Sequence, residues 1–271
     1  MRVVVALVLA QLFFAAPALV TPARAQGQFE GVYTLSMAGL PIGKLTWRAH
    51  IGATDYTTSV SGRAVGIFTI LLSGDGNVLV KGTMKDGRPQ PLTYTSTDTR
   101  ENEKTSVNIT FDGSKVRDLK VIEPPPESDR VPITDAHKSD VIDPLSAFLI
   151  PGTRSDGLAP SSCQRTLPVF DGRRRFDLAL SYRRLDKAAP EKGYTGPALV
   201  CAVKFIPISG HRSSSPLVEF LSKGRDIEIW FVPVAGTRLL APIKLVVASV
   251  LGDMALRADQ FETSPAFAPA P

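Results

Sequence analysis

The chain has 271 residues, of which 44% are hydrophobic and 21% charged, an ordinary composition for a folded protein with a core. Its net charge is +5, and removal of Arg2 and Arg24 with the leader described below lowers this to +3. Such a small basic excess gives no reason to expect a nucleic-acid partner. The 22 prolines and 21 glycines are spread along the chain and favour many turns over long helices.

The first 25 residues have the pattern of a secretory signal peptide. Arg2 is followed by the apolar run Val3–Val20 and then by Ala23-Arg24-Ala25, which is a small-x-small cleavage site. The alternative is a transmembrane anchor, but the apolar run is short, and no later stretch reaches the roughly 20 apolar residues of a membrane helix. We therefore predict a periplasmic mature protein that begins at Gln26 and has no transmembrane segment.

Apolar and polar residues alternate with period two along most of the mature chain, which predicts many short strands. Asp86-Gly87 and Asp112-Gly113 are dipeptides typical of hairpin turns, and Gly74-Asp75-Gly76 is also expected to be a turn. The stretch 243–251 is apolar on both faces, so it belongs in the interior of a sheet. The candidate strands are 29–37, 45–51, 56–60, 77–84, 92–98, 106–111, 116–122, 167–170, 174–185, 198–206, 227–232 and 243–256.

Short helices are expected in two or three places. Asp140 or Asp143 can cap one helix, with Pro144 in its first turn. Leu217, Phe220 and Leu221 have the spacing of a second helix. The predicted fold class is therefore predominantly all-β, as a curved antiparallel sheet, an open barrel or a sandwich with these short helices.

The proline-rich stretch Glu123–Pro132 is the best candidate for a linker. It can separate two halves of one sheet or two domains, and the continuous pattern of strands favours the first arrangement. We expect a single β-rich domain over 26–263, followed by a disordered tail at 264–271.

Two groups of residues are candidates for ligand binding. Ile67, Phe68 and Leu71 lie in an apolar stretch that breaks the alternation and reads either as a short helix or as a lid over an apolar ligand. Arg173, Arg175 and Arg183 fall on one face of a predicted hairpin, where a phosphate or lipid headgroup can dock. The alternative for the arginines is an edge strand that its charges protect from pairing.

Cys163 and Cys201 are the only cysteines, and in an exported chain we expect them to form a disulfide rather than remain two buried thiols. No pattern typical of a metal site is present, and His137 within Asp135–Asp140 reads as part of a solvated loop. The motifs GxSxG, GxxxxGK, GxGxxG and HExxH are absent. We therefore assign no catalytic residues, metal or cofactor.

Four stretches in a fixed order carry a resemblance to a known family. They are Tyr33–Gly43, Asp143–Phe148, Val169–Arg174 and Ile229–Ile243. Together they resemble the exported bacterial family catalogued as domain of unknown function 3108, over about residues 29–261. The segment that follows Phe148 lacks the aromatic-arginine ending of that signature. The resemblance implies a periplasmic location and a β-rich fold, and it carries no assigned activity.

These features favour a non-enzymatic periplasmic protein that binds an apolar or amphiphilic ligand or a component of the envelope. Its partner would be a lipid or an envelope protein. One alternative is an adaptor that docks to another envelope protein through a sheet edge. A hydrolase of envelope polymers is disfavoured because the chain shows no constellation of nucleophile and base.

Overall fold

The strands form one extended sheet in a computed structural model that describes residues 26–64, 74–100, 103–122, 129–153, 158–223, 226–248 and 252–265. The 15-stranded sheet has the order β7-β6-β5-β4-β3-β2-β1-β15-β14-β13-β12-β10-β9, and β8 and β11 pair beside this path. Neighbouring strands are antiparallel, except that the short β11 runs parallel to β15. Within the described ranges only two α-helices occur, so the predicted fold class is confirmed.

The order of strands defines two meanders that meet in the middle of the sheet, where β1 pairs with β15. The first meander comprises β1 (Gly27–Met37), β2 (Leu40–Ile51), β3 (Asp55–Ala64), β4 (Gly74–Lys85), β5 (Arg88–Arg100), β6 (Glu103–Asp112) and β7 (Lys115–Ile122). The second comprises β9 (Arg165–Phe170), β10 (Arg175–Ala188), β11 (Lys192–Gly193), β12 (Gly196–Ser209), β13 (Ile227–Pro233), β14 (Leu239–Val247) and β15 (Met254–Pro265). The connection carries η2 (Asp135–Lys138), α1 (Pro144–Ala147), β8 (Ile150–Pro151) and η3 (Pro160–Ser162), and α2 (Pro216–Ser222) follows β12.

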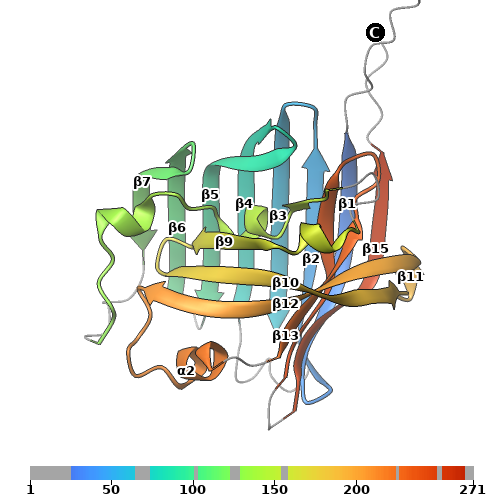
Figure 1. Cartoon of the computed structure of the whole chain (residues 1–271). Helices are drawn as coiled ribbons and strands as arrows, with labels where there is room; N and C mark the ends of the chain where they lie inside the picture. The colour runs from blue at the N-terminus through green and yellow to red at the C-terminus, as the bar shows by residue number, and fades with distance from the viewer. Residues whose placement is uncertain are drawn as a thin grey trace, which may run out of the picture.

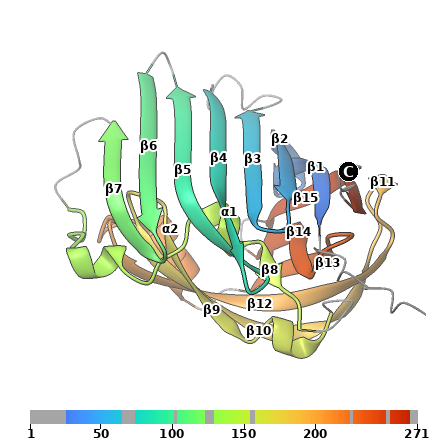
Figure 2. The ribbon, with the colours of Figure 1, turned by 90° about the horizontal axis from the view of Figure 1, so that it is seen from above.

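The sheet curls strongly but stays open. Figure 1 shows β9, β10 and β12 crossing in front of the first meander, and Figure 2 shows β3 to β7 rising away from that layer. Residues 141–142 span the two edges of the sheet, because Val141 N donates to Ser114 O over 2.8 Å and Ile142 N donates to Pro168 O over 2.9 Å. Ser114 belongs to the turn before β7 and Pro168 to β9, so this short segment links one edge of the sheet to the other.

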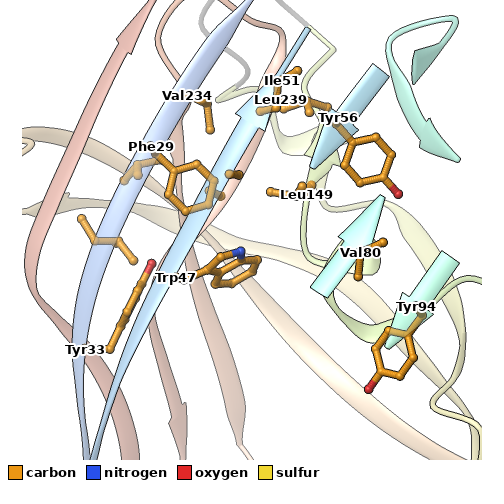
Figure 3. Close-up of a cluster of buried hydrophobic side chains, with 14 of the residues drawn as sticks. Phe29, Tyr33, Trp47, Ile51, Tyr56, Val80, Tyr94, Leu149, Val234 and Leu239 are labelled. Carbon is orange, nitrogen blue, oxygen red and sulfur yellow. The ribbon is translucent and has the colours of Figure 1, made fainter. Parts of the chain in front are cut away.

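The main core lies on the face of β1 to β6 that carries Trp47, Val80 and Ile109, which we call the concave face. Figure 3 shows Phe29, Trp47 and Leu149 in this cluster. The Phe29 ring contacts Trp47 edge-on, with ring centroids 5.7 Å apart, and stacks on Phe261 of β15 with centroids 5.2 Å apart. These contacts pack the first strand, the second strand and the last strand of the chain against one another.

Both faces of β12 and β13 are buried. Val200 and Trp230 belong to the core on one face, while Cys201 and Ile229 belong to a second cluster on the other. In β14, Leu239 belongs to the main core and Leu240 belongs to the second cluster. For the part of 243–251 that lies in β14, up to Val247, the predicted place in the interior of the sheet is confirmed, because β14 pairs with β13 on one side and β15 on the other; 249–251 lie outside the described residues.

Local sequence signals account for several connections. Asp86 and Gly87, with φ of 51° and 73°, join β4 to β5 through a two-residue turn that requires left-handed backbone at both positions. Asp143 caps α1, since its Oδ1 accepts hydrogen bonds from Leu145 N over 2.9 Å and Ser146 N over 3.0 Å. Pro144 occupies the first turn of α1, as the sequence predicts.

The two cysteines are joined. Cys163 follows η3 and Cys201 lies in β12, and their Cα atoms are 5.6 Å apart across the disulfide. Both residues are completely buried in the second cluster. The predicted pairing is therefore confirmed.

Two details of the sequence analysis are wrong. Gly74-Asp75-Gly76 is not a turn but the beginning of β4, where Gly76 pairs with Gly62 of β3 and with Asp98 of β5. Glycine normally weakens a strand, but here the neighbouring strands supply the hydrogen bonds. The expected tail also begins too early, because Ser264 and Pro265 extend β15 and pair with Gln28 and Gly27.

The described segments contain no helix with the length and apolar character needed to span a membrane. The longer of the two α-helices, α2, has 7 residues.

Candidate functional site

Side chains on the concave face lie in rows that cross the strands. One row contains Trp47, Val60, Val78, Ser96 and Val107, and every position in it carries a side chain. The next row, nearer to the ends of β3 and β5, contains Leu45, Gly62, Gly76 and Asp98. Two adjacent strands therefore contribute no side chain at the same level of the sheet.

This pair of glycines lies in a hollow with a volume of about 480 Å³. A Cβ atom added at Gly76 would meet only Asp98 Oδ1, at 4.0 Å, so the space in front of this position is open. The volume lies within the range of small-molecule sites, about 300–1,000 Å³. The apolar part of the lining is formed by Leu35, Ile42, Leu45, Val60 and Val78.

The lining of the hollow also includes a polar group formed by Ser96, Asp98 and Arg173. Arg173 comes from the turn between β9 and β10, not from the strands beneath it. Asp171 shapes this turn by accepting hydrogen bonds from Arg173 N over 2.8 Å and Arg174 N over 2.6 Å. Burial raises the pKa of Asp171, and these hydrogen bonds oppose the shift.

Gly172 allows the same turn to lie against the first meander. Its φ of +90° is in the region that favours glycine, and an added Cβ would lie 2.3 Å from Val107 Cγ1. From this turn Arg173 Nη2 donates to Ile122 O of β7 over 3.4 Å. The turn therefore brings a cation from the second meander to the hollow of the first.

A second polar group, which does not line the hollow, is buried around Asp143 at the start of α1. This residue is 0% exposed; its Oδ1 caps α1, whereas no hydrogen-bond partner lies near Oδ2 among the described residues. Burial raises the pKa of Asp143 to about 6, and the hydrogen bonds from Ser146 and Leu145 limit the rise. The hydroxyl groups of Tyr56 and Ser146 are 2.5 Å apart, which ties α1 to β3.

The predicted arginine site is not assembled as expected. Arg173 lines the hollow, but Arg175 Nη1 is bonded to Asp177 Oδ1 over 2.5 Å. Arg183 Nε lies 3.3 Å from Glu228 Oε1. Each of these two arginines is thus engaged by a carboxylate, and Arg183 shares Glu228 with Arg184. Ile67, Phe68 and Leu71 lie outside the described residues.

Of the residues that shape the hollow, the sequence pointed to Arg173 but not to Gly62, Gly76 or Asp98. Gly62 and Gly76 were missed because glycine in an alternating pattern reads as a turn or a weak position. The available signal was that both glycines occupy core-facing positions of consecutive strands, which marks a site of close approach or open space. Asp98 lies at the same level only because of the register of β4 and β5.

The stretch around His137 offers no metal site. His137 Nδ1 accepts a hydrogen bond from Thr134 N over 3.1 Å within the short helix η2. Across the described parts of the chain, no group of three or more His, Cys, Asp or Glu residues is arranged to hold a metal ion.

These features define a strongly curled, predominantly antiparallel β-sheet protein with a hollow on its concave face. The chain belongs to the family described as "Protein of unknown function (DUF3108)", whose profile matches residues 32–259. A search of curated proteins finds no match.

Among solved structures, the chain is similar to one titled "Crystal Structure of Beta-barrel-like Protein of Domain of Unknown Function DUF1849 from Brucella abortus". The identity is 10% and the TM-score is 0.46, with 89% of this chain and 98% of that chain covered. At this distance the likeness concerns the general architecture and carries no further conclusion.

Proposed function

We propose that this protein is a non-enzymatic binding protein of the periplasm that holds an amphiphilic ligand in the hollow of its concave face. The observation that carries the proposal is the hollow of about 480 Å³ at Gly62 and Gly76, with open space in front of Gly76. An apolar chain would contact Leu45 and Val78. The polar end of the ligand would lie beside Asp98 and Arg173.

The chemistry of the lining supports an amphiphile rather than a purely polar or purely apolar ligand. Five of the lining residues are aliphatic, namely Leu35, Ile42, Leu45, Val60 and Val78. Burial of each ligand methylene against them contributes about 0.8 kcal/mol. A cation and a carboxylate in the same lining, Arg173 and Asp98, provide hydrogen bonds that fix the orientation of a polar group.

The proposed location rests on the leader pattern and is supported by the disulfide between Cys163 and Cys201, since disulfides persist in oxidising compartments. N-terminal sequencing of the protein from a periplasmic extract tests it, and an intact Met1 on membrane-associated protein would contradict it.

The adaptor alternative has less support. The open edge of the first meander is β7, whose exposed residues include Lys115, Arg117, Asp118 and Lys120. Charges along an edge strand hinder the addition of another strand. This edge is therefore a poor surface for docking through main-chain hydrogen bonds.

A Gly76→Leu variant tests the hollow directly. The added side chain projects into open space, and displacement of two ligand methylenes would cost about 1.6 kcal/mol, or roughly a fifteenfold loss of affinity. Titration with a fluorescent fatty acid and with its methyl ester measures this loss and shows whether the charged headgroup matters. We expect Gly76→Leu to bind both probes more weakly than the parent does.

The matched control is Lys81→Leu, which adds the same side chain to an exposed position of the same strand on the opposite face. It should bind both probes like the parent. If Gly76→Leu stays folded and binds as tightly as the parent, or if the parent binds neither probe saturably, the proposed site is wrong.

A further inference from the structure

A small notch lies away from the hollow, between four strands of the second meander. Its volume is about 220 Å³, and its lining includes Asp186 and Lys187 of β10, Trp230 of β13, Lys244 of β14 and Arg257 of β15. The hollow on the concave face is lined mainly by β1 to β5, so the two sites share no residue.

Two cations of the notch face each other directly. Lys244 and Arg257 are paired residues of the antiparallel strands β14 and β15, so their side chains project from the same face of the sheet. Cβ atoms of such pairs are about 5 Å apart, and like charges at this spacing are destabilising. Within the described ranges, neither side chain has a carboxylate within 4.0 Å.

Other cations nearby are neutralised. Lys44 Nζ lies 3.6 Å from Asp259 Oδ2, and Lys192 Nζ lies 2.8 Å from Glu262 Oε1. Arg184, which also approaches the Trp230 ring, donates two hydrogen bonds to Glu228 over 2.7 and 2.9 Å. Lys244 and Arg257, together with Lys187 of the same lining, therefore differ from these cations, since no carboxylate lies within 4.0 Å of their charged groups among the described residues.

The carboxylate in the notch lining, Asp186, is already engaged. Asp186 Oδ2 accepts a hydrogen bond from Trp230 Nε1 over 2.8 Å, and its Oδ1 accepts one from Lys187 N over 2.7 Å. Lys244 Nζ instead lies over the Trp230 ring, 3.9 Å from its centroid. Burial, followed by the charge of Arg257, lowers the pKa of Lys244, and the charges of Asp186 and Glu228 oppose this shift.

We propose that this notch binds a phosphate group through Lys244 and Arg257, with Trp230 as one wall. A phosphate carries enough negative charge to offset both cations, and the planar guanidinium matches the spacing of two of its oxygens. The volume suits a phosphate group and excludes a long chain. The group can come from free phosphate or from a phospholipid headgroup, because both present the same oxygens.

The indole N–H signals of the two tryptophans, Trp230 and Trp47, can report whether phosphate binds in the notch. The indole N–H of Trp230 donates into the notch, whereas that of Trp47 donates to Thr58 Oγ1 in the core and serves as an internal reference. Inorganic phosphate is titrated at constant ionic strength while both indole signals are followed by nuclear magnetic resonance. In parallel, sedimentation is measured with vesicles of phosphatidylcholine, with and without phosphatidylglycerol.

We expect phosphate to shift the Trp230 signal saturably without moving that of Trp47. Arg257→Gln and Lys244→Gln should each weaken this binding about tenfold or more, because each removes a charge-assisted contact. Lys44→Gln removes a cation that is already paired and should bind like the parent. Arg257 is exposed, so its variant should fold.

The outcomes separate the two sources and test the site. Saturable binding of phosphate assigns the notch to free phosphate; sedimentation only with phosphatidylglycerol, lost in Arg257→Gln, assigns it to a headgroup. The proposal is overturned if neither probe binds, or if Arg257→Gln and Lys244→Gln bind as the parent does. It is also overturned if Lys44→Gln loses as much binding as they do.

Discussion

Asp143 should make the free energy of unfolding depend on pH in a way that Asp143→Asn removes. The carboxyl group has a pKa of about 6 when folded, against an ordinary value of 3.8. Because the pKa is raised, the folded state holds the proton more tightly than the unfolded state. The contribution of this group to stability is therefore greatest below pH 4 and is lost as pH rises towards about 6.

The magnitude follows from the shift. About two pKa units at 1.36 kcal/mol per unit give about 3 kcal/mol, which is the penalty for the buried carboxylate at neutral pH. Asparagine has an oxygen that can keep the cap of α1, and it does not ionise. The difference in unfolding free energy, variant minus parent, should therefore rise by about 2.4 kcal/mol between pH 4 and pH 7, because part of the full effect is already lost at pH 4.

Urea unfolding followed by tryptophan fluorescence at several pH values measures this difference. Any effect of Asp143→Asn on stability that does not depend on pH cancels, because only the change of the difference with pH is compared. Asp135→Asn is the control, since its carboxylate is 99% exposed and reports the loss of a surface charge. A difference that stays flat from pH 4 to pH 7, or that falls, would refute the reasoning about burial.

Two further predictions concern the bond between Cys163 and Cys201 and the turn at Gly172. Cys163→Ser should lower the unfolding free energy by up to about 4 kcal/mol, since the bond closes a loop with a separation of 38 residues, and the double Cys→Ser variant should be no worse. Urea unfolding decides this, and an unchanged midpoint would contradict it. Gly172→Ala should cost more than Gly113→Ala, whose added Cβ meets nothing within 4 Å, because at Gly172 the contact with Val107 adds to a backbone strain of about 1 kcal/mol. Equal thermal midpoints for the two variants would show that the turn does not press against the sheet.

Local patterns predict much of this fold, because a strand with one buried face shows alternating apolar and polar residues in the sequence. The strands, the Asp86-Gly87 turn and the cap at Asp143 all depend on residues close in sequence. The pairing of the two cysteines also followed, since only one partner was available for each.

The candidate site depends on relations that no local pattern contains. The hollow arises because the register places Gly62 beside Gly76, and because a turn from the second meander delivers Arg173. The sequence places Arg175 near Arg173 but does not show that Asp177 will engage it. Likewise, the opposed cations Lys244 and Arg257 are found only once β14 is paired with β15.

The pairing of β1 with β15 has a consequence for how the chain acquires its structure. A hydrogen bond across this seam joins Thr263 to Gln28, residues 235 positions apart. Each meander is made of adjacent hairpins that can form early, but the seam can close only after the last strand has been delivered. Until then β1 and β14 each present an open edge, the kind of surface on which strands of other chains add. The final strand therefore covers both edges. A chain cut before Met254 would leave the edges of β1 and β14 unpaired and would aggregate more readily than the full chain.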